Sequence, residues 1–105
     1  MTSALAQTTW WLDSGALPER LLWARLVVAT DDSAVVLDCD GHYHRFSTSQ
    51  AAKLWLQEDE YSLLSHLIEE GEVGPGQAPP SAPNDTALVP LMMRPNTSLE
   101  RTRGR

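Results

Sequence analysis

DCDGHYHRF, residues 38–46, is the stretch that decides how the centre of this chain folds. Its Asp40-Gly41 pair stands between two runs of strand-forming residues. An Asp-Gly pair in that setting is among the strongest signals for a tight β-hairpin, because the turn needs positive φ at both central residues. If these two residues are the whole loop, Cys39 lies opposite His42. The stretch also holds the only cysteine and two of the three histidines, so it is either a hairpin tip or a metal site.

Two apolar runs precede the hairpin and extend the sheet that it begins. They are RLLWARLVVAT (residues 20–30) and SAVVLDC (33–39), both rich in β-branched or aliphatic residues and separated by Asp31-Asp32, a turn signal. Together with HYHRF they predict a three-stranded antiparallel meander. Residues 17–26 could instead begin as a helix, because a proline and a glutamate stand where a first turn would start.

Two-residue loops at both turns would sort the side chains onto two faces, since successive residues of a strand point to opposite sides. In that register Val28 faces Val35, and Leu37 faces His44. One face is then apolar and predicts the core, along which the hairpin cysteine and histidines also lie: Leu22, Ala24, Leu26, Val28, Val35, Leu37 and Phe46. The other face is amphipathic: Trp23, Arg25, Val27, Val36, Asp38, Tyr43 and Arg45.

Helix signals follow the sheet. Ser47 to Gln50 fit a capping box, with Ser47 as N-cap, and Asp59 offers a second N-cap before an amphipathic run that ends at Gly71. One or two helices would close over the core face. Upstream, Trp10 and Trp11 predict a short strand or an extended arm. In a strand the two tryptophans would point to opposite faces. The predicted fold is α+β: an antiparallel meander of three to four strands, with one or two helices packed on one face.

Composition divides the 105 residues into three parts. Residues 1–9 are expected to be a flexible N-terminus, and residues 10–72 hold the apolar content of a single α+β domain. Residues 73–105 are rich in proline and predict a disordered tail. Within that tail the apolar island ALVPLMMR (87–94) could dock on the domain or on a partner.

Charge argues against nucleic acid as a ligand. The net charge is −6, and residues 1–74 carry twelve acidic and four basic side chains, which repel phosphate backbones. A single cysteine cannot form an internal disulfide, and the apolar runs are too short to span a bilayer. The start of the chain lacks the pattern of a signal peptide. We therefore expect a cytoplasmic protein that binds neither nucleic acid nor membrane.

The cysteine and histidines suggest one alternative function. Cys39, His42 and His44 have the ligand chemistry of a zinc site, Asp38 and Asp40 could add oxygen ligands, and His66 is the one further histidine. The spacing matches no zinc finger or zinc ribbon, so no metal site is favoured. A Cys39–His42 catalytic pair is a weaker alternative, because no oxyanion-hole motif or orienting third residue accompanies it. No cofactor motif is present, and we expect no enzyme.

The amphipathic face is the favoured site. Trp23, Arg25, Tyr43 and Arg45 are residue types enriched at the energetic centres of protein interfaces. They predict a non-catalytic protein-interaction module, of antitoxin, immunity or adaptor type, whose partner is another protein or a second copy in a homodimer. The acidic surface would steer a basic partner.

The last twelve residues, RPNTSLERTRGR (94–105), resemble the C-terminal tail of small bacterial proteins whose reading frames run through mobile gene-cassette recombination sites. The resemblance implies a bacterial, laterally mobile gene and a tail of translated recombination-site sequence. Binding, antitoxin and immunity proteins are plausible members of that class. The resemblance covers only the tail and implies nothing about the fold.

Overall fold

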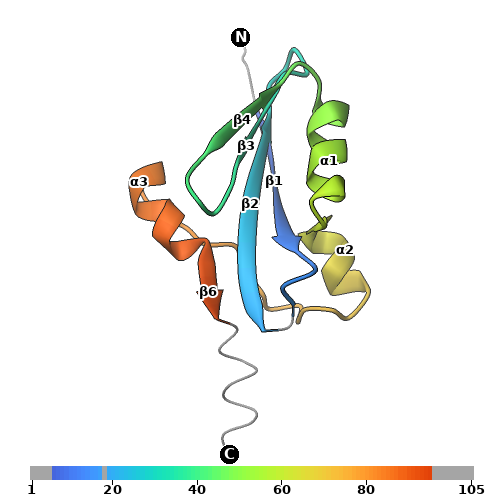
Figure 1. The fold of residues 1–105 in the computed structure, drawn as a ribbon, viewed down its shortest axis with the longest axis vertical. Coiled ribbons are helices and arrows are strands. Elements are labelled where there is room, and N and C mark those ends of the chain that lie inside the picture. Colours follow the sequence, from blue (N-terminus) through green and yellow to red (C-terminus); the bar gives the residue numbers. More distant parts are fainter. Residues whose placement is uncertain (1–5, 18, 96–105) are drawn as a thin grey trace, which may run out of the picture.

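The computed structural model describes residues 6–17 and 19–95. One antiparallel sheet runs through the molecule in the strand order β4-β3-β2-β1-β5, and β6 pairs with β2 (Figure 1). The predicted α+β class is confirmed. The elements in chain order are β1 (Gln7–Asp13), β2 (Arg20–Val28), β3 (Ala34–Leu37), β4 (Tyr43–Phe46), α1 (Ser49–Glu58), β5 (Tyr61–Leu63), α2 (Leu64–Glu69), α3 (Asp85–Leu88), the short 3-10 helix η1 (Val89–Leu91) and β6 (Met93–Pro95).

Both predicted turns are present, and each is one residue longer than expected. At the hairpin tip the N–H of Asp38 donates to the carbonyl of His42 at 3.1 Å, so the loop is Cys39-Asp40-Gly41. Gly41 has φ 88°. A three-residue loop that ends on a left-handed residue is a common hairpin connection.

The turn between β2 and β3 has the same design. The N–H of Ala29 donates to the carbonyl of Ser33 at 2.8 Å, and Asp32, the last loop residue, has φ 73°. A left-handed residue therefore closes each loop, glycine in one and aspartate in the other. Aspartate is one of the few residues with a side chain that adopts this conformation readily.

The longer loops shift β3 by one residue against both neighbours, which corrects the predicted faces. Val28 pairs with Ala34 rather than Val35, and His44 pairs with Val36 rather than Leu37. A shift of one residue sends every side chain of the strand to the opposite face. Val36 therefore lies in the core beneath α1, whereas Leu37 lies in a second core on the other face.

Helix α1 covers one face of the sheet. Thr48, not Ser47, is its N-cap, and the Thr48 hydroxyl accepts from the N–H of Ala51 at 3.1 Å. Ala52 and Leu56 are fully buried on its inner side. The core that they share with the sheet, here called the helix-side core, contains Trp11, Ala24, Leu26, Ala34, Val36, Ala52, Leu56 and Tyr61.

The expected N-cap at Asp59 is wrong. Asp59 closes the C-terminus of α1, and its N–H bonds to the carbonyls of Trp55 and Leu56. The chain then turns at Glu60, which has φ 67°, adds β5 to the edge of β1, and begins α2 only at Leu64.

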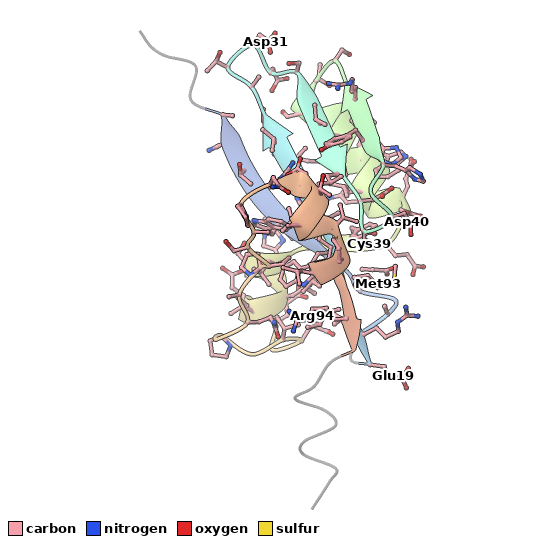
Figure 2. All side chains as sticks on the ribbon, turned by 90° about the vertical axis from the view of Figure 1, so that its left-hand side faces the viewer. Glu19, Asp31, Cys39, Asp40, Met93 and Arg94 are labelled. Atoms are coloured by element: carbon pink, nitrogen blue, oxygen red, sulfur yellow. The ribbon has the colours of Figure 1, made fainter. Side chains whose placement is uncertain are left out.

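The opposite face is covered by residues 73–95, here called the strap, which the sequence places in a disordered tail. In this segment Val73, Leu88 and Met92 are buried. They belong to a second core, here called the strap-side core: Leu12, Leu21, Trp23, Leu37, Leu67, Val73, Leu88 and Met92. The apolar island thus docks on its own domain. Figure 2 looks onto this face, with α3 and β6 in front of the sheet.

The expected domain boundaries therefore move outward. Strand β1 begins at Gln7, inside the stretch expected to be a flexible N-terminus, and the packed chain continues to β6 beyond residue 72. The two tryptophans of β1 do point to opposite faces, because Trp11 lies in the helix-side core and Trp10 packs against the strap-side core. Residues 1–5 and 96–105, where the rest of the predicted N-terminus and tail falls, lie outside the described residues. Within the described residues no helix has the length and apolar character needed to cross a membrane.

Candidate functional site

Trp23, the largest member of the predicted interaction face, is a core residue. Its side chain is 1% exposed, and its ring meets the Trp10 ring edge-on, with centroids 5.9 Å apart. The C-terminal segment, which the sequence leaves unfolded, provides the cover: the N–H of Trp23 donates to the carbonyl of Met92 at 2.8 Å. Trp23 therefore cannot contact a partner while residues 73–95 are in place.

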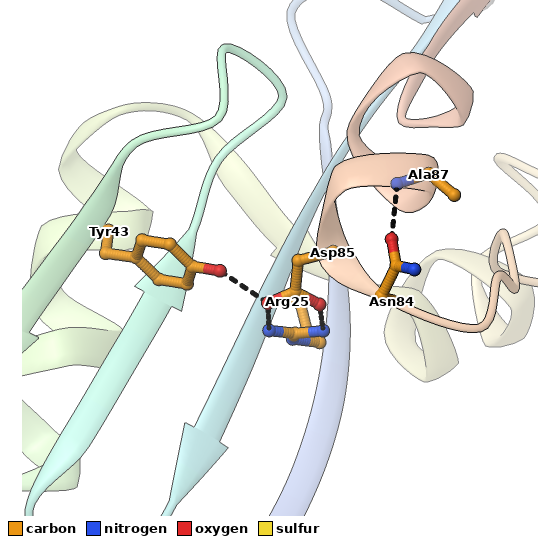
Figure 3. Close-up of polar contacts among 5 residues, drawn as sticks. All are labelled: Arg25, Tyr43, Asn84, Asp85 and Ala87. Carbon is orange, nitrogen blue, oxygen red and sulfur yellow. Dashed lines mark hydrogen bonds and ion pairs between the residues drawn. The ribbon is translucent and has the colours of Figure 1, made fainter.

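Arg25 is also engaged within the chain. Its guanidinium forms a bidentate ion pair with Asp85 of α3, with Nη1–Oδ1 at 2.8 Å and Nη2–Oδ2 at 3.0 Å (Figure 3). The hydroxyl of Tyr43 donates to the same carboxylate. Asn84 starts α3 and accepts from the N–H of Ala87 at 2.9 Å, which fixes the position of Asp85. The three side chains join β2, β4 and α3 in one network.

The hydrogen bonds of this network shift the pKa values of its three side chains. The hydrogen bond to Asp85 raises the pKa of Arg25. The hydrogen bonds from Arg25 and then from Tyr43 lower the pKa of Asp85 to about 2. The hydrogen bond that the Tyr43 hydroxyl donates to Asp85 raises the pKa of Tyr43 in turn. Within the described residues, Nε of Arg25 is buried without a hydrogen-bond partner, so the arginine is held by the two Nη groups.

Tyr43 and Arg45 remain on the surface. Tyr43 is 50% exposed, and Arg45 is exposed beside it on β4, the edge strand next to β3. Arg45 pairs with Val35, which pairs with Val27, and both valines are half-buried. These four residues form the part of the face that the C-terminal segment leaves open: Val27, Val35, Tyr43 and Arg45. This set is here called the open patch.

The hairpin tip does not assemble the predicted metal set. The oxygen and nitrogen atoms that come within 4.8 Å of one another belong to Asp38, Asp40 and His42. The ring of His44 instead lies on Trp55, with centroids 4.4 Å apart, and its Nε2 is 2.7 Å from Asp38.

The remaining two members of the set, Cys39 and His66, make other contacts. His66 belongs to α2 and lines a separate cavity, and Cys39 packs against the strap-side core. Burial, with the nearby charges of Asp40 and Asp38, raises the pKa of Cys39. A raised pKa keeps the thiol protonated and is the opposite of what a nucleophile needs.

Asp38 acts as a structural acceptor. Its Oδ1 accepts from the backbone N–H of Asp40 at 2.9 Å and of His42 at 3.0 Å. Burial alone would raise the pKa of Asp38, but the hydrogen bonds from His44 and from the two N–H groups outweigh it, and the pKa is lowered. The carboxylate therefore holds the loop shape.

A cavity on the opposite edge of the molecule was not expected from the sequence. It has a volume of about 330 Å³ and lies between α1, α2 and the outer side of β1. Its lining includes Thr9, Trp11, Lys53, Gln57, His66 and Glu70. The paired tryptophans of β1 were the available signal, but the cavity depends on β5, which the sequence does not predict.

Comparison of the chain with protein-family models, with curated proteins and with solved structures finds no match. The function therefore has to be argued from the geometry of the chain itself.

Proposed function

We propose that this chain is a non-catalytic protein-interaction module that binds a protein partner through the open patch. The observation that carries the proposal is Tyr43, which is half exposed and yet fixed in position. Its hydroxyl is tied to Asp85, and Asp85 is tied to Arg25 by two hydrogen bonds. An exposed aromatic ring that is already ordered loses little entropy on binding.

The composition of the open patch supports this role. Tyrosine and arginine are over-represented among the residues that dominate binding energy, and Tyr43 and Arg45 stand two residues apart on the same face of β4. The half-buried valines Val27 and Val35 add apolar area beside them. An apolar centre with a charged rim is the common anatomy of a protein interface.

The surrounding charge supports a basic partner. The chain has a net charge of −6, and the exposed Asp40 lies at the hairpin next to Tyr43, beside the largely buried Asp38. Such a field accelerates the approach of a positively charged surface. Together with the resemblance of the last twelve residues to gene-cassette tails, this favours an antitoxin, immunity or adaptor role in the bacterial cytoplasm.

The test is a comparison of Tyr43→Ala and Arg45→Ala with Leu54→Ala. Leu54 is 51% exposed on α1, so its truncation removes similar exposed apolar surface away from the open patch. The partner is captured from a bacterial lysate, purified, and titrated by calorimetry against each folded variant. We expect the two patch variants to lose affinity on the order of ten- to thirty-fold and Leu54→Ala to bind like the wild type. Equal binding by all three variants, or loss at Leu54 alone, would overturn the proposal.

A further inference from the structure

The cavity beside β1 is formed where three parts of the chain meet. Strand β1 forms its inner side, α1 forms one wall, and β5 with α2 forms the other wall. Helices α1 and α2 lie on the same side of β1 (Figure 1). The apolar stripe of α2 faces elsewhere, because Leu67 is buried in the strap-side core and Leu64 and Ile68 pack against that core. A different stripe of α2, with His66 and Glu70, therefore lines the cavity.

Each helical wall presents two polar side chains that are one turn apart. On α1 they are Lys53 and Gln57, and on α2 they are His66 and Glu70. Residues four apart lie on the same face of a helix. The N–H of Glu70 donates to the carbonyl of His66 at 2.9 Å, so this spacing holds to the end of α2. All four side chains are exposed, which places them at the mouth of the cavity.

The inner end of the cavity is apolar. Trp11 and Tyr61 are buried there, and Leu63, which pairs with Trp11, is half-buried. The indole N–H of Trp11 already donates to the hydroxyl of Thr9 at 3.1 Å. A charged group placed at this end would lose its hydration without compensation, so this end suits an apolar group.

The mouth of the cavity carries charges of both signs. Lys53 on one wall is positive, and Glu70 on the other wall is negative. The ion pairs among the described residues are formed by Arg25, His42 and His44 with aspartates, so Lys53 and Glu70 do not pair with each other. A ligand with a single charge would be attracted by one wall and repelled by the other. A ligand with both charges can form a charge-assisted hydrogen bond with each wall.

We propose that this cavity binds a free amino acid with an apolar side chain. The ligand side chain lies at the inner end against Trp11 and Leu63, the carboxylate accepts from Lys53, and the ammonium group donates to Glu70. An apolar interior with a few polar groups that fix orientation is the usual design of a small-molecule site. The volume of about 330 Å³ is near the lower end of the range for such sites, about 300–1,000 Å³, and suits a single amino acid. The site shares no residue with the open patch, so it is independent of the proposed partner site.

The first test is a titration of the isotope-labelled chain with L-phenylalanine, followed by NMR of the tryptophan indole N–H groups. Trp11 reports on the inner end of the cavity, and Trp23, in the strap-side core, is the internal control. We expect a saturable shift of the Trp11 signal and no shift of the Trp23 signal. L-Leucine and L-methionine extend the test to aliphatic side chains. If none of the three amino acids shifts the Trp11 signal, the proposal is wrong.

Two analogues separate the roles of the two charges. Phenylpropionate lacks the ammonium group, and phenylethylamine lacks the carboxylate. We expect each to bind the wild type at least about ten-fold more weakly than L-phenylalanine. Lys53→Met should weaken the binding of L-phenylalanine and phenylpropionate about ten-fold and leave that of phenylethylamine unchanged. Glu70→Gln should weaken the binding of L-phenylalanine and phenylethylamine instead. Phenylpropionate that binds the wild type as tightly as L-phenylalanine would contradict a site for both charges.

The matched control is Glu69→Gln, which removes an exposed acid of the same helix from outside the cavity lining. It should bind all three compounds like the wild type. The three substituted side chains, Lys53, Glu69 and Glu70, are exposed, so we expect each variant to fold, which circular dichroism verifies. If Lys53→Met and Glu70→Gln bind L-phenylalanine as tightly as Glu69→Gln does, the charges at the mouth do not hold the ligand and the assignment fails.

Discussion

The two faces of the sheet are covered by different parts of the chain, and the two covers have different chemistry. The helix-side core is closed by α1, which follows β4 directly and contributes Ala52 and Leu56. The strap-side core is closed by residues 73–95, far along the chain, and it adds the ion pair between Arg25 and Asp85 to its apolar contacts.

A proline-rich segment can therefore complete a core. Only a few of its side chains are buried: Val73, Leu88 and Met92. Proline restricts the unfolded chain and so reduces the entropy that is lost on ordering such a segment. These three side chains, the polar network around Asp85 and the pairing of β6 with β2 hold the segment on the sheet, and Gly41 at the hairpin tip also lies next to Val89.

Removal of residues 75–105 should have the largest effect on stability. It strips Leu88 and Met92 from the strap-side core and opens Trp23 to water, so we expect a loss of several kcal/mol, enough to unfold a small domain. Urea unfolding, followed by tryptophan emission, measures the effect. Removal of residues 96–105 alone is the control and should leave the midpoint unchanged. If both shortened chains unfold like the full chain, the strap does not stabilise the fold.

A matched pair of truncations compares the two covers directly. Leu56 and Met92 are both fully buried, one in each core. We expect Leu56→Ala and Met92→Ala each to lower the free energy of unfolding by about 2–5 kcal/mol, as measured by chemical denaturation. A cost below about 1 kcal/mol for Met92→Ala, with Leu56→Ala in the full range, would show that the strap covers the sheet without stabilising it.

The helix-side cover was predictable from the sequence, because its signals are local. The Asp-Gly turn, the alternating apolar runs and the cap before α1 act over a few residues each. The cap was misplaced by one residue, from Ser47 to Thr48. The register was also off by one, because the loops at Asp32 and Gly41 close on a left-handed third residue. Sequence alone does not distinguish a two-residue loop from a three-residue loop that ends on the same glycine.

The strap-side cover was not predictable, because its contacts span long distances in the chain. Arg25 and Asp85 are 60 residues apart, and nothing near either residue indicates the pairing. The apolar island was visible, but its docking site on Trp23 and Leu37 exists only after β3 is in its true register. Of the four predicted interaction residues, Tyr43 and Arg45 stay on the surface; the other two hold the strap.

The contacts of the strap should be sensitive to acid, because they include the ion pair between Arg25 and Asp85. The pKa of Asp85 is lowered to about 2 in the folded chain from an ordinary value of 3.8. As the pH falls, Asp85 is therefore protonated at a higher pH in the unfolded chain than in the folded chain. The stabilisation is complete above about pH 4 and is lost as the pH falls toward 2.

Asp85→Asn should remove this dependence. Asp85 is 37% exposed, so we expect roughly 1 kcal/mol of lost stability at neutral pH, shrinking to nothing near pH 2 in denaturation series at successive pH values. Thr48→Ala is the control, because it removes the N-cap hydrogen bond of α1 and leaves Asp85 in place, so its cost should be constant between pH 4 and 2. A constant cost for Asp85→Asn as well would mean that the ion pair does not form.

The smallest expected effect is a shift in the titration of Tyr43, without loss of folding. Asp85 accepts the phenol hydrogen bond and carries negative charge, and both raise the pKa of Tyr43, while Arg25 and Arg45 lower it. Loss of the carboxylate in Asp85→Asn should therefore lower the pKa, as followed by phenolate absorbance. Tyr43→Phe assigns the signal, because burial raises the pKa of Tyr61, the other tyrosine, and keeps it from titrating early. If Tyr43 titrates at the same pH with and without Asp85, the phenol does not donate to Asp85, and α3 is not tied to β4.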